Sequence, residues 1–213
     1  MDYIKVFISY SSEERKVAGL LRDFLQEYCG YKVFLAHDDM IPATNFKEGI
    51  KKEIGESDFF IPLISDLFSQ SEYTDQEVGI AIGINIKIIP VKIDKNPYGL
   101  LSDYQALTVH SDSIESIREL ASKIGILALK HYTGNYGEKA KNSIIKALEN
   151  SPHFRSSNVI IKIMCECPKF SKKHISSIIN TIKTNHEVQG AFGLPSLKQM
   201  LIGRYKIEVE TSE

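Results

Sequence analysis

The feature that most constrains the fold is a regular alternation, over the first 130 residues, of short β-rich runs and segments with helical periodicity. The β-branched and aromatic runs predict strands, and apolar residues three and four positions apart predict the amphipathic helices between them. Parallel strands need crossover connections, so this order predicts a parallel sheet with helices on both faces. We expect an α/β fold with a flavodoxin-like, five-stranded parallel sheet. The five predicted strands are Lys5–Tyr10, Tyr31–Leu35, Asp58–Ile64, Lys87–Ile93 and Leu107–His110.

Two of these predicted strands contain a proline, Pro62 in the third and Pro90 in the fourth. Proline has no backbone N–H and cannot donate to a strand ladder. We therefore expect the hydrogen bonding of the sheet to be interrupted near these residues.

The pattern changes after His131, where four further segments are better explained as helices than as strands. A turn-rich segment, Tyr132–Gly137, precedes them and predicts a linker. We predict an α/β domain at residues 1–130, a linker at 131–137 and a small α-helical C-terminal module at 138–213. The four predicted helices cover residues 138–149, 158–167, 171–184 and 196–205.

Composition is that of an ordinary globular protein, with 43% hydrophobic and 25% charged residues. Residues 1–130 hold 14 Lys and Arg against 20 Asp and Glu, whereas residues 131–213 hold 12 against 7, which indicates two modules with different surfaces. Aromatic residues are sparse near the basic run at Lys169–His174, so we do not predict nucleic-acid binding.

The three cysteines form no disulfide framework and favour a reducing compartment. The N-terminus has no signal-peptide pattern, and every apolar run is far shorter than the roughly 20 residues that span a bilayer. We expect a cytoplasmic protein without a membrane segment. Cys165 and Cys167 lie two positions apart on a predicted helix and point to different faces, so we predict no metal site.

Ligands of open α/β sheets bind outside the carboxyl ends of the strands. The turn after the first predicted strand, Ser11-Ser12-Glu13-Glu14, contains no glycine, so it is neither a dinucleotide fingerprint nor a phosphate-binding loop. Tyr73 and Glu77 are four residues apart at the start of a predicted helix and share one of its faces. Spacing alone leaves two explanations: a carboxylate and an aromatic ring that serve chemistry, or a helix-start glutamate with a packing tyrosine.

Three stretches together resemble a Toll/interleukin-1 receptor (TIR) domain of the prokaryotic type, over about residues 3–125. The stretches are VFISYSSEERKVAGLLRDFLQ, YKVFLAHDDMIPATNFKEGIKKEIGESDFFIPLIS, and SEYTDQEVGIAIG followed by IIPVKID. The resemblance implies an NAD+ glycohydrolase or cyclase that breaks the nicotinamide–ribose bond, giving nicotinamide and ADP-ribose or a cyclic ADP-ribose-type signal, in prokaryotic antiviral defence. NAD+ would be the substrate, and no cofactor is implied.

The resemblance assigns the catalytic role to Glu77. At the aromatic position four residues before it, where the family often has a tryptophan, this chain has Tyr73. It also implies self-association through the TIR domain and a possible downstream effector that responds to the nucleotide product. The loop His37–Asn45 corresponds to a family loop that gates the site. The substrate-binding residues implied by the resemblance are Ser9, Tyr10, Ser11, Phe34, Asp38, Phe46 and Tyr73.

Two other functions stay open at this point. Many animal TIR domains are non-catalytic scaffolds that act through homotypic contacts, and a third possibility is a receptor that binds a nucleotide without turnover. Free nicotinamide after incubation with NAD+ separates an enzyme from both.

Overall fold

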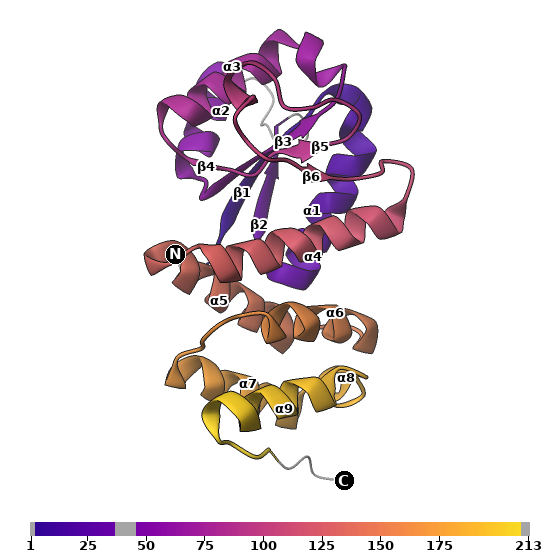
Figure 1. Ribbon diagram of the computed structural model, residues 1–213, viewed down its shortest axis with the longest axis vertical. Helices are drawn as coiled ribbons and strands as arrows, with labels where there is room; N and C mark the ends of the chain where they lie inside the picture. Colours follow the sequence, from indigo (N-terminus) through magenta and orange to yellow (C-terminus); the bar gives the residue numbers. More distant parts are fainter. Residues whose placement is uncertain (1–2, 37–45, 210–213) are drawn as a thin grey trace. The chain divides into compact units, whose positions relative to one another are not determined.

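The computed structural model describes residues 3–36 and 46–209 of the chain, and it divides into two compact units (Figure 1). The sheet unit comprises Ile4–Phe24 and Lys32–Leu120. The helical unit comprises Tyr3, Leu25–Tyr31 and the chain from Ala121 onward. Two helices therefore contribute residues to both units.

The sheet unit contains one parallel sheet in the strand order β2-β1-β3-β5-β6, with β4 also paired to β3. This order confirms the predicted flavodoxin-like, five-stranded arrangement, because β4 and β5 together occupy the position of the fourth predicted strand. The strands are β1 (Lys5–Ser9), β2 (Lys32–Leu35), β3 (Phe59–Ile64), β4 (Lys87–Ile88), β5 (Val91–Lys92) and β6 (Leu107–Thr108).

The fourth predicted strand is divided at its proline, as the sequence led us to expect. Phe59 and Phe60 of β3 pair with β4, whereas Leu63 and Ile64 pair with β5. Pro62 lies between these two ladders on β3, and Pro90 lies between β4 and β5. Because neither proline has an N–H to donate, the ladder breaks at this level.

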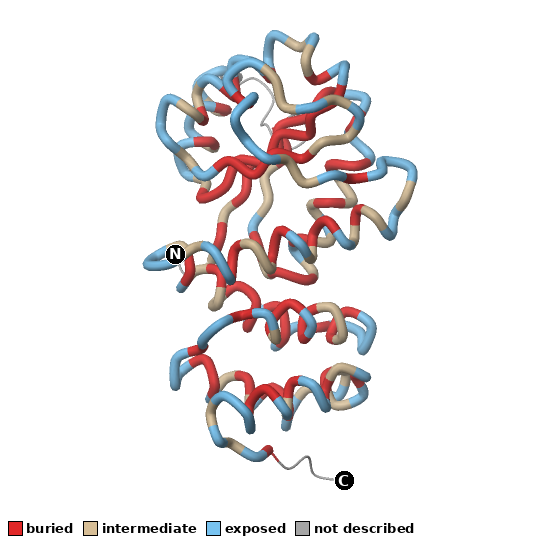
Figure 2. Tube along the Cα trace, in the orientation of Figure 1, coloured by how far each residue is buried: buried red, intermediate tan, exposed pale blue. Residues whose placement is uncertain are grey.

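Helices cover the sheet and bury its apolar side chains (Figure 2). On the side of α2 and α3, a core cluster includes Phe7 and Phe60 from the sheet, Ile50 and Ile54 from α2, and Val78 from α3. These residues recur at helical and strand spacing, which is why the elements form where the sequence predicts. The helices of this part of the chain are α1 (Arg15–Cys29), α2 (Phe46–Glu56), α3 (Glu72–Gly83) and α4 (Ile114–His131), with short 3-10 turns at Ser12–Glu14, Phe68–Gln70 and Gly99–Leu101.

The helical unit is built around four longer helices and one short one. Its buried polar side chains find partners: the Ser171 N–H donates to Nδ1 of His174 (3.3 Å), and Nε2 of that ring pairs with Asn142 Oδ1 (3.0 Å). The Ser151 and Ser157 hydroxyls lie 2.8 Å apart. These helices are α5 (Gly134–Glu149), α6 (Phe154–Cys165), α7 (Lys172–Thr184), α8 (His186–Gln189) and α9 (Leu194–Tyr205).

The predicted linker at 131–137 differs from the structure. Helix α5 begins at Gly134, so only Tyr132 and Thr133 separate it from α4. The two glycines of this segment have different structural reasons: Gly134 adopts a φ of +60°, and a Cβ at Gly137 would lie 2.5 Å from the Tyr132 carbonyl oxygen.

The predicted boundary at residue 130 also differs from the compact units. Cys29 at the end of α1 donates from Sγ to the Ala121 carbonyl oxygen (3.7 Å), and the Ser156 hydroxyl donates to the Glu27 carboxylate. A Cβ at Gly30 would lie 2.2 Å from the Ser143 carbonyl oxygen. The last turn of α1 and the second half of α4 therefore group with the C-terminal helices. Within residues 3–36 and 46–209, no helix has the length and apolar character needed to cross a membrane.

Candidate functional site

The candidate site lies at the carboxyl edge of the sheet, where the strand order reverses between β1 and β3. The chain leaves β1 toward β2 on one side, whereas β3 and the strands after it extend the sheet on the other. The two connections leave the sheet in opposite directions at this point, and the crevice between them is the usual place for a ligand in this architecture. Ser9 is the last residue of β1, and α3 is the helix that follows β3.

Local hydrogen bonds fix the start of α3. Ser71 is its N-cap, and the Ser71 Oγ accepts from the Thr74 N–H (3.4 Å). The Thr74 hydroxyl donates to the carbonyl oxygens of Phe68 (2.6 Å) and Ser71 (2.8 Å), which ties the helix to the turn before it. With the first turn held, Tyr73 and Glu77 are presented on one face of α3.

Glu77 is a buried acid, with only 2% of the residue exposed. The Ser9 hydroxyl donates to its Oε2 at 2.5 Å, whereas Oε1 has no hydrogen-bond partner among the described residues. Burial raises the pKa of this carboxyl group to about 7, and the hydrogen bond from Ser9 opposes that rise. The side chain therefore changes charge near neutral pH, and one of its two buried oxygens has no hydrogen-bond partner among the described residues.

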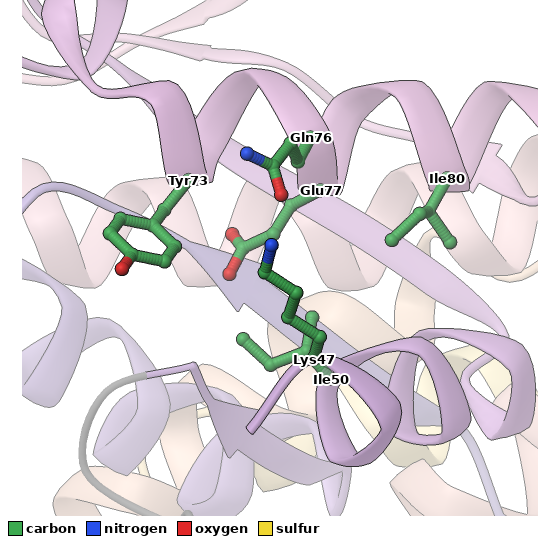
Figure 3. A pocket seen from close by; sticks show the side chains of 6 residues that line it. All are labelled: Lys47, Ile50, Tyr73, Gln76, Glu77 and Ile80. Atoms are coloured by element: carbon green, nitrogen blue, oxygen red, sulfur yellow. The ribbon is translucent and has the colours of Figure 1, made fainter. Parts of the chain in front are cut away.

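A small pocket with a cavity volume of about 30 Å³ opens beside this carboxylate (Figure 3). In the close view the Tyr73 ring and the Glu77 carboxylate point into the same space from α3, and Lys47 reaches toward it from α2. Tyr73 is 53% exposed, so one face of its ring is accessible to a planar group. The residues that line the pocket are Lys47, Ile50, Tyr73, Gln76, Glu77 and Ile80.

Three of the residues implicated by the sequence meet at this place: Ser9, Tyr73 and Glu77. Tyr10 and Ser11 are buried and do not line the pocket. Phe34 does not line it either, because its ring stacks on Phe7 with centroids 5.5 Å apart. Contact of these three residues with substrate stays a prediction.

Two further predicted residues fall at the edge of the described chain. Asp38 lies outside the described residues, together with the rest of the loop at 37–45. Phe46 is the first residue of α2, but its side chain is not among those that the structure describes. Their roles also stay predictions.

The sequence reasoning missed four residues of the pocket. Gln76 and Ile80 lie three and seven residues after Tyr73, so helical spacing could have placed them on the same face. Lys47 and Ile50 come from α2, and only the packing of α2 against α3 brings them here.

A second buried acid lies near the end of β1. Glu14 is 8% exposed, and burial raises the pKa of its carboxyl group, against the hydrogen bond from Ser65. Its Oε2 and the Oγ of Ser11 have no hydrogen-bond partner among the described residues. Among those residues, no group of three or more His, Cys, Asp or Glu is placed to hold a metal ion.

Solved structures similar to this chain include the TIR domain of the Toll-related receptor TRR-2 from Hydra magnipapillata. It is 25% identical, with a TM-score of 0.45, over 56% of this chain and 92% of that one. The Clostridium botulinum CMP N-glycosidase BcmB is 23% identical, with a TM-score of 0.40, over 55% of this chain and 96% of that one. No curated protein matches the chain.

The family comparison addresses the sheet unit directly. A family model described as TIR domain matches residues 6–121, which is more than half of the chain. The match begins in β1 and ends in α4, so it includes Ser9, Lys47, Tyr73 and Glu77. The chain therefore belongs to the TIR domain family.

Proposed function

We propose that the sheet unit cleaves NAD+ at the nicotinamide–ribose bond and that Glu77 is its catalytic residue. One observation carries the proposal: a carboxylate that is 2% exposed keeps one oxygen without a partner among the described residues, in a pocket that also presents an accessible tyrosine ring. Several enzymes of the TIR family cleave NAD+, which gives the proposal its substrate.

The reaction requires little from the protein beyond charge and position. When the bond between C1′ of the ribose and the ring nitrogen breaks, its electron pair goes to nicotinamide, which leaves as a neutral molecule. The ribose carbon becomes electron-poor, and a buried carboxylate stabilises that positive charge. Water then forms the new bond to C1′ and releases one proton, giving ADP-ribose. In the cyclising variant a nitrogen of the adenine base takes the place of water.

Because the leaving group of NAD+ is already cationic, no general acid is needed, and one carboxylate is sufficient. The carboxylate must be ionised to act, and a pKa of about 7 leaves a large fraction ionised at neutral pH. The low polarity of the site that raises the pKa also strengthens the attraction between the carboxylate and the reacting carbon. Tyr73 would stack on the nicotinamide ring and orient it.

A scaffold that acts only through homotypic contacts gives no reason for this arrangement. Leaving a buried polar atom without a hydrogen bond costs about 1–3 kcal/mol, and more when the group is charged. A docking domain gains nothing in return, whereas an enzyme gains an acceptor for its substrate.

The resemblance extends the proposal beyond the reaction. Loss of NAD+, or a cyclised product read by a separate effector, would serve prokaryotic antiviral defence. Self-association through the TIR domain would control the activity.

The test is release of nicotinamide from NAD+, measured by chromatography, for the wild-type protein, Glu77→Gln and Glu77→Ala. Assays include concentrated and crowded protein, so that self-association can occur. We expect both variants to lose about a thousandfold or more in rate. Mass spectrometry of the products separates linear from cyclised ADP-ribose.

Glu72→Gln is the matched control, since it removes an exposed carboxylate from the first turn of the same helix. We expect this variant to keep the wild-type rate. Undiminished turnover by Glu77→Ala would remove Glu77 from the role, and a wild-type protein that releases no nicotinamide under any of these conditions would contradict the proposed function.

A further inference from the structure

Opposite charges share the pocket of the sheet unit. Glu77 lies buried at its inner side, and Lys47, the second residue of α2, is exposed. Figure 3 shows the Lys47 ammonium group directed toward the side of the pocket that holds the Glu77 carboxylate. Of the described residues that line the pocket, Lys47 is the one with a positive charge.

Among the described residues, Lys47 takes part in no ion pair, whereas Lys52 on the same helix lies 3.9 Å from Glu56 and Lys5 lies 2.8 Å from Glu56. The turn after β1 offers serines and glutamates at positions 11–14 and no cation. A positive charge near the site is therefore supplied by α2 and not by that turn.

The charges of a pyridine dinucleotide are also separated. Its nicotinamide–ribose end carries one positive charge, and its diphosphate carries two negative charges. The cavity beside Glu77 is small, about 30 Å³, which is room for only about one or two water-sized groups. A substrate bound with its nicotinamide–ribose bond beside Glu77 would carry its diphosphate outside so small a cavity, on the side of the exposed Lys47. The buried anion and the exposed cation are thus ordered as the substrate requires.

Resting on the proposed function, we propose that Lys47 binds the diphosphate of the substrate. This contact would make the site selective for NAD+ over nicotinamide riboside, the nucleoside that lacks the phosphates. Lys47 is a specificity-determining residue on this proposal, because it contacts a part of the substrate remote from the bond that breaks. A lysine ammonium binds phosphate as a point charge, so the contact depends on salt concentration.

An alternative task for Lys47 is to act on Glu77 itself. Removal of a nearby positive charge would then make the carboxylate harder to ionise, and every substrate would be affected alike. The two tasks separate when substrates with and without phosphate are compared.

The experiment compares wild type, Lys47→Ala and Lys51→Ala with NAD+ and with nicotinamide riboside, which has no phosphate. Lys51 is the matched control, since it is an exposed lysine one turn further along α2 that does not line the pocket. For Lys47→Ala we expect KM for NAD+ to rise about 10-fold, equal to about 1.4 kcal/mol, with kcat unchanged. We expect kcat/KM for nicotinamide riboside to stay within about twofold of the wild-type value, and Lys51→Ala to match wild type with both substrates.

Equal losses with both substrates, or no loss with either, would overturn the role of Lys47. A second measurement removes the dependence on turnover: calorimetric binding of NAD+ to Glu77→Gln and to the double variant with Lys47→Ala. We expect about 10-fold weaker binding by the double variant, with a smaller dependence on salt. Equal binding by the two proteins would overturn the inference even if the wild type proved inactive, whereas wild-type inactivity toward both substrates would contradict the proposed function alone.

Discussion

The two units of the molecule treat their buried polar side chains differently. In the helical unit, His174 is held through both ring nitrogens, and the Thr181 hydroxyl donates to the Ser177 carbonyl oxygen (2.9 Å). In the sheet unit, Ser11 Oγ, Glu14 Oε2 and Glu77 Oε1 are buried without a hydrogen-bond partner among the described residues.

This difference indicates what each unit is built for. The buried polar side chains described in the helical unit have partners, which stabilises one arrangement of its helices, as expected for a structural module. Unsatisfied atoms lower stability, and in the sheet unit they belong to residues at or near the end of β1 and on α3, by the proposed active site. The helical unit should therefore be sensitive to changes in packing, whereas the sheet unit should become more stable when its unsatisfied acid is neutralised.

Gly30→Ala gives the largest effect that we expect on stability. Gly30 has φ +67°, which strains an alanine, and the new Cβ would lie 2.2 Å from the Ser143 backbone oxygen within the helical unit. We expect the free energy of unfolding to fall by about 3 kcal/mol or more, measured by urea denaturation.

The control for Gly30 is Gly134→Ala. Gly134 has a similar φ of +60°, but its Cβ would meet nothing within 4 Å. Strain alone then applies, and we expect a loss of about 1 kcal/mol. Similar losses in the two variants would show that packing against Ser143 is not the cause, and the contrast between the units would weaken.

Glu77→Gln should stabilise the protein, in a pH-dependent manner. The folded-state pKa of about 7 lies above the ordinary value of 4.5, so the folded protein holds its proton more tightly and wild-type stability falls as pH rises from about 4.5 through 7. Glutamine imitates the protonated form. We expect a gain in unfolding free energy below about 1 kcal/mol at pH 5 and of about 3 kcal/mol at pH 8, measured by denaturation at both values.

The raised pKa of Glu14 lowers wild-type stability in the same direction, so the difference between wild type and Glu77→Gln isolates Glu77. Glu72→Gln again serves as control, with an expected change below about 0.5 kcal/mol at either pH. A destabilised Glu77→Gln protein at pH 8 would contradict the idea that this carboxylate is kept at the expense of stability.

Ser9→Ala tests the smaller contribution of the hydrogen bond to Glu77. The Ser9 hydroxyl opposes the rise in the Glu77 pKa, so its removal moves the midpoint of the kcat/KM profile to higher pH. We expect about 10-fold lower kcat/KM for NAD+ at pH 6.5 and a near wild-type value at pH 8.5. A loss of equal size at both pH values would assign Ser9 to positioning rather than to the charge of Glu77.

Much of the fold could be predicted because local pattern and global arrangement agree in the sheet unit. The apolar runs at 5–9 and 59–64 form strands, and the two prolines divide the ladder where they stand. The predicted linker differs from the helix that begins at Gly134, because the glycines at 134 and 137 have the composition of a turn, whereas the close approach of Gly137 to Tyr132 is visible only in three dimensions.

The site could be predicted where its residues lie on one element. Tyr73 and Glu77 share a helix face by spacing alone, and their chemistry follows from that face. Lys47 could not be predicted in this way, because it lies 30 positions from Glu77 on another helix, and their proximity depends on how α2 packs beside α3. The hydrogen bond between Ser9 and Glu77 likewise depends on tertiary structure.

The prolines of the sheet have one more consequence. Pro62 and Pro90 leave β3 joined to its neighbour by two separate ladders of two residue pairs each. On its other side β3 pairs with β1 through this level without a gap, from Phe59 beside Val6 to Pro62 beside Ser9. The β1 ladder therefore carries the continuity of the sheet past the prolines, and slow amide exchange should extend through β1 and β3 even where the fourth predicted strand is interrupted.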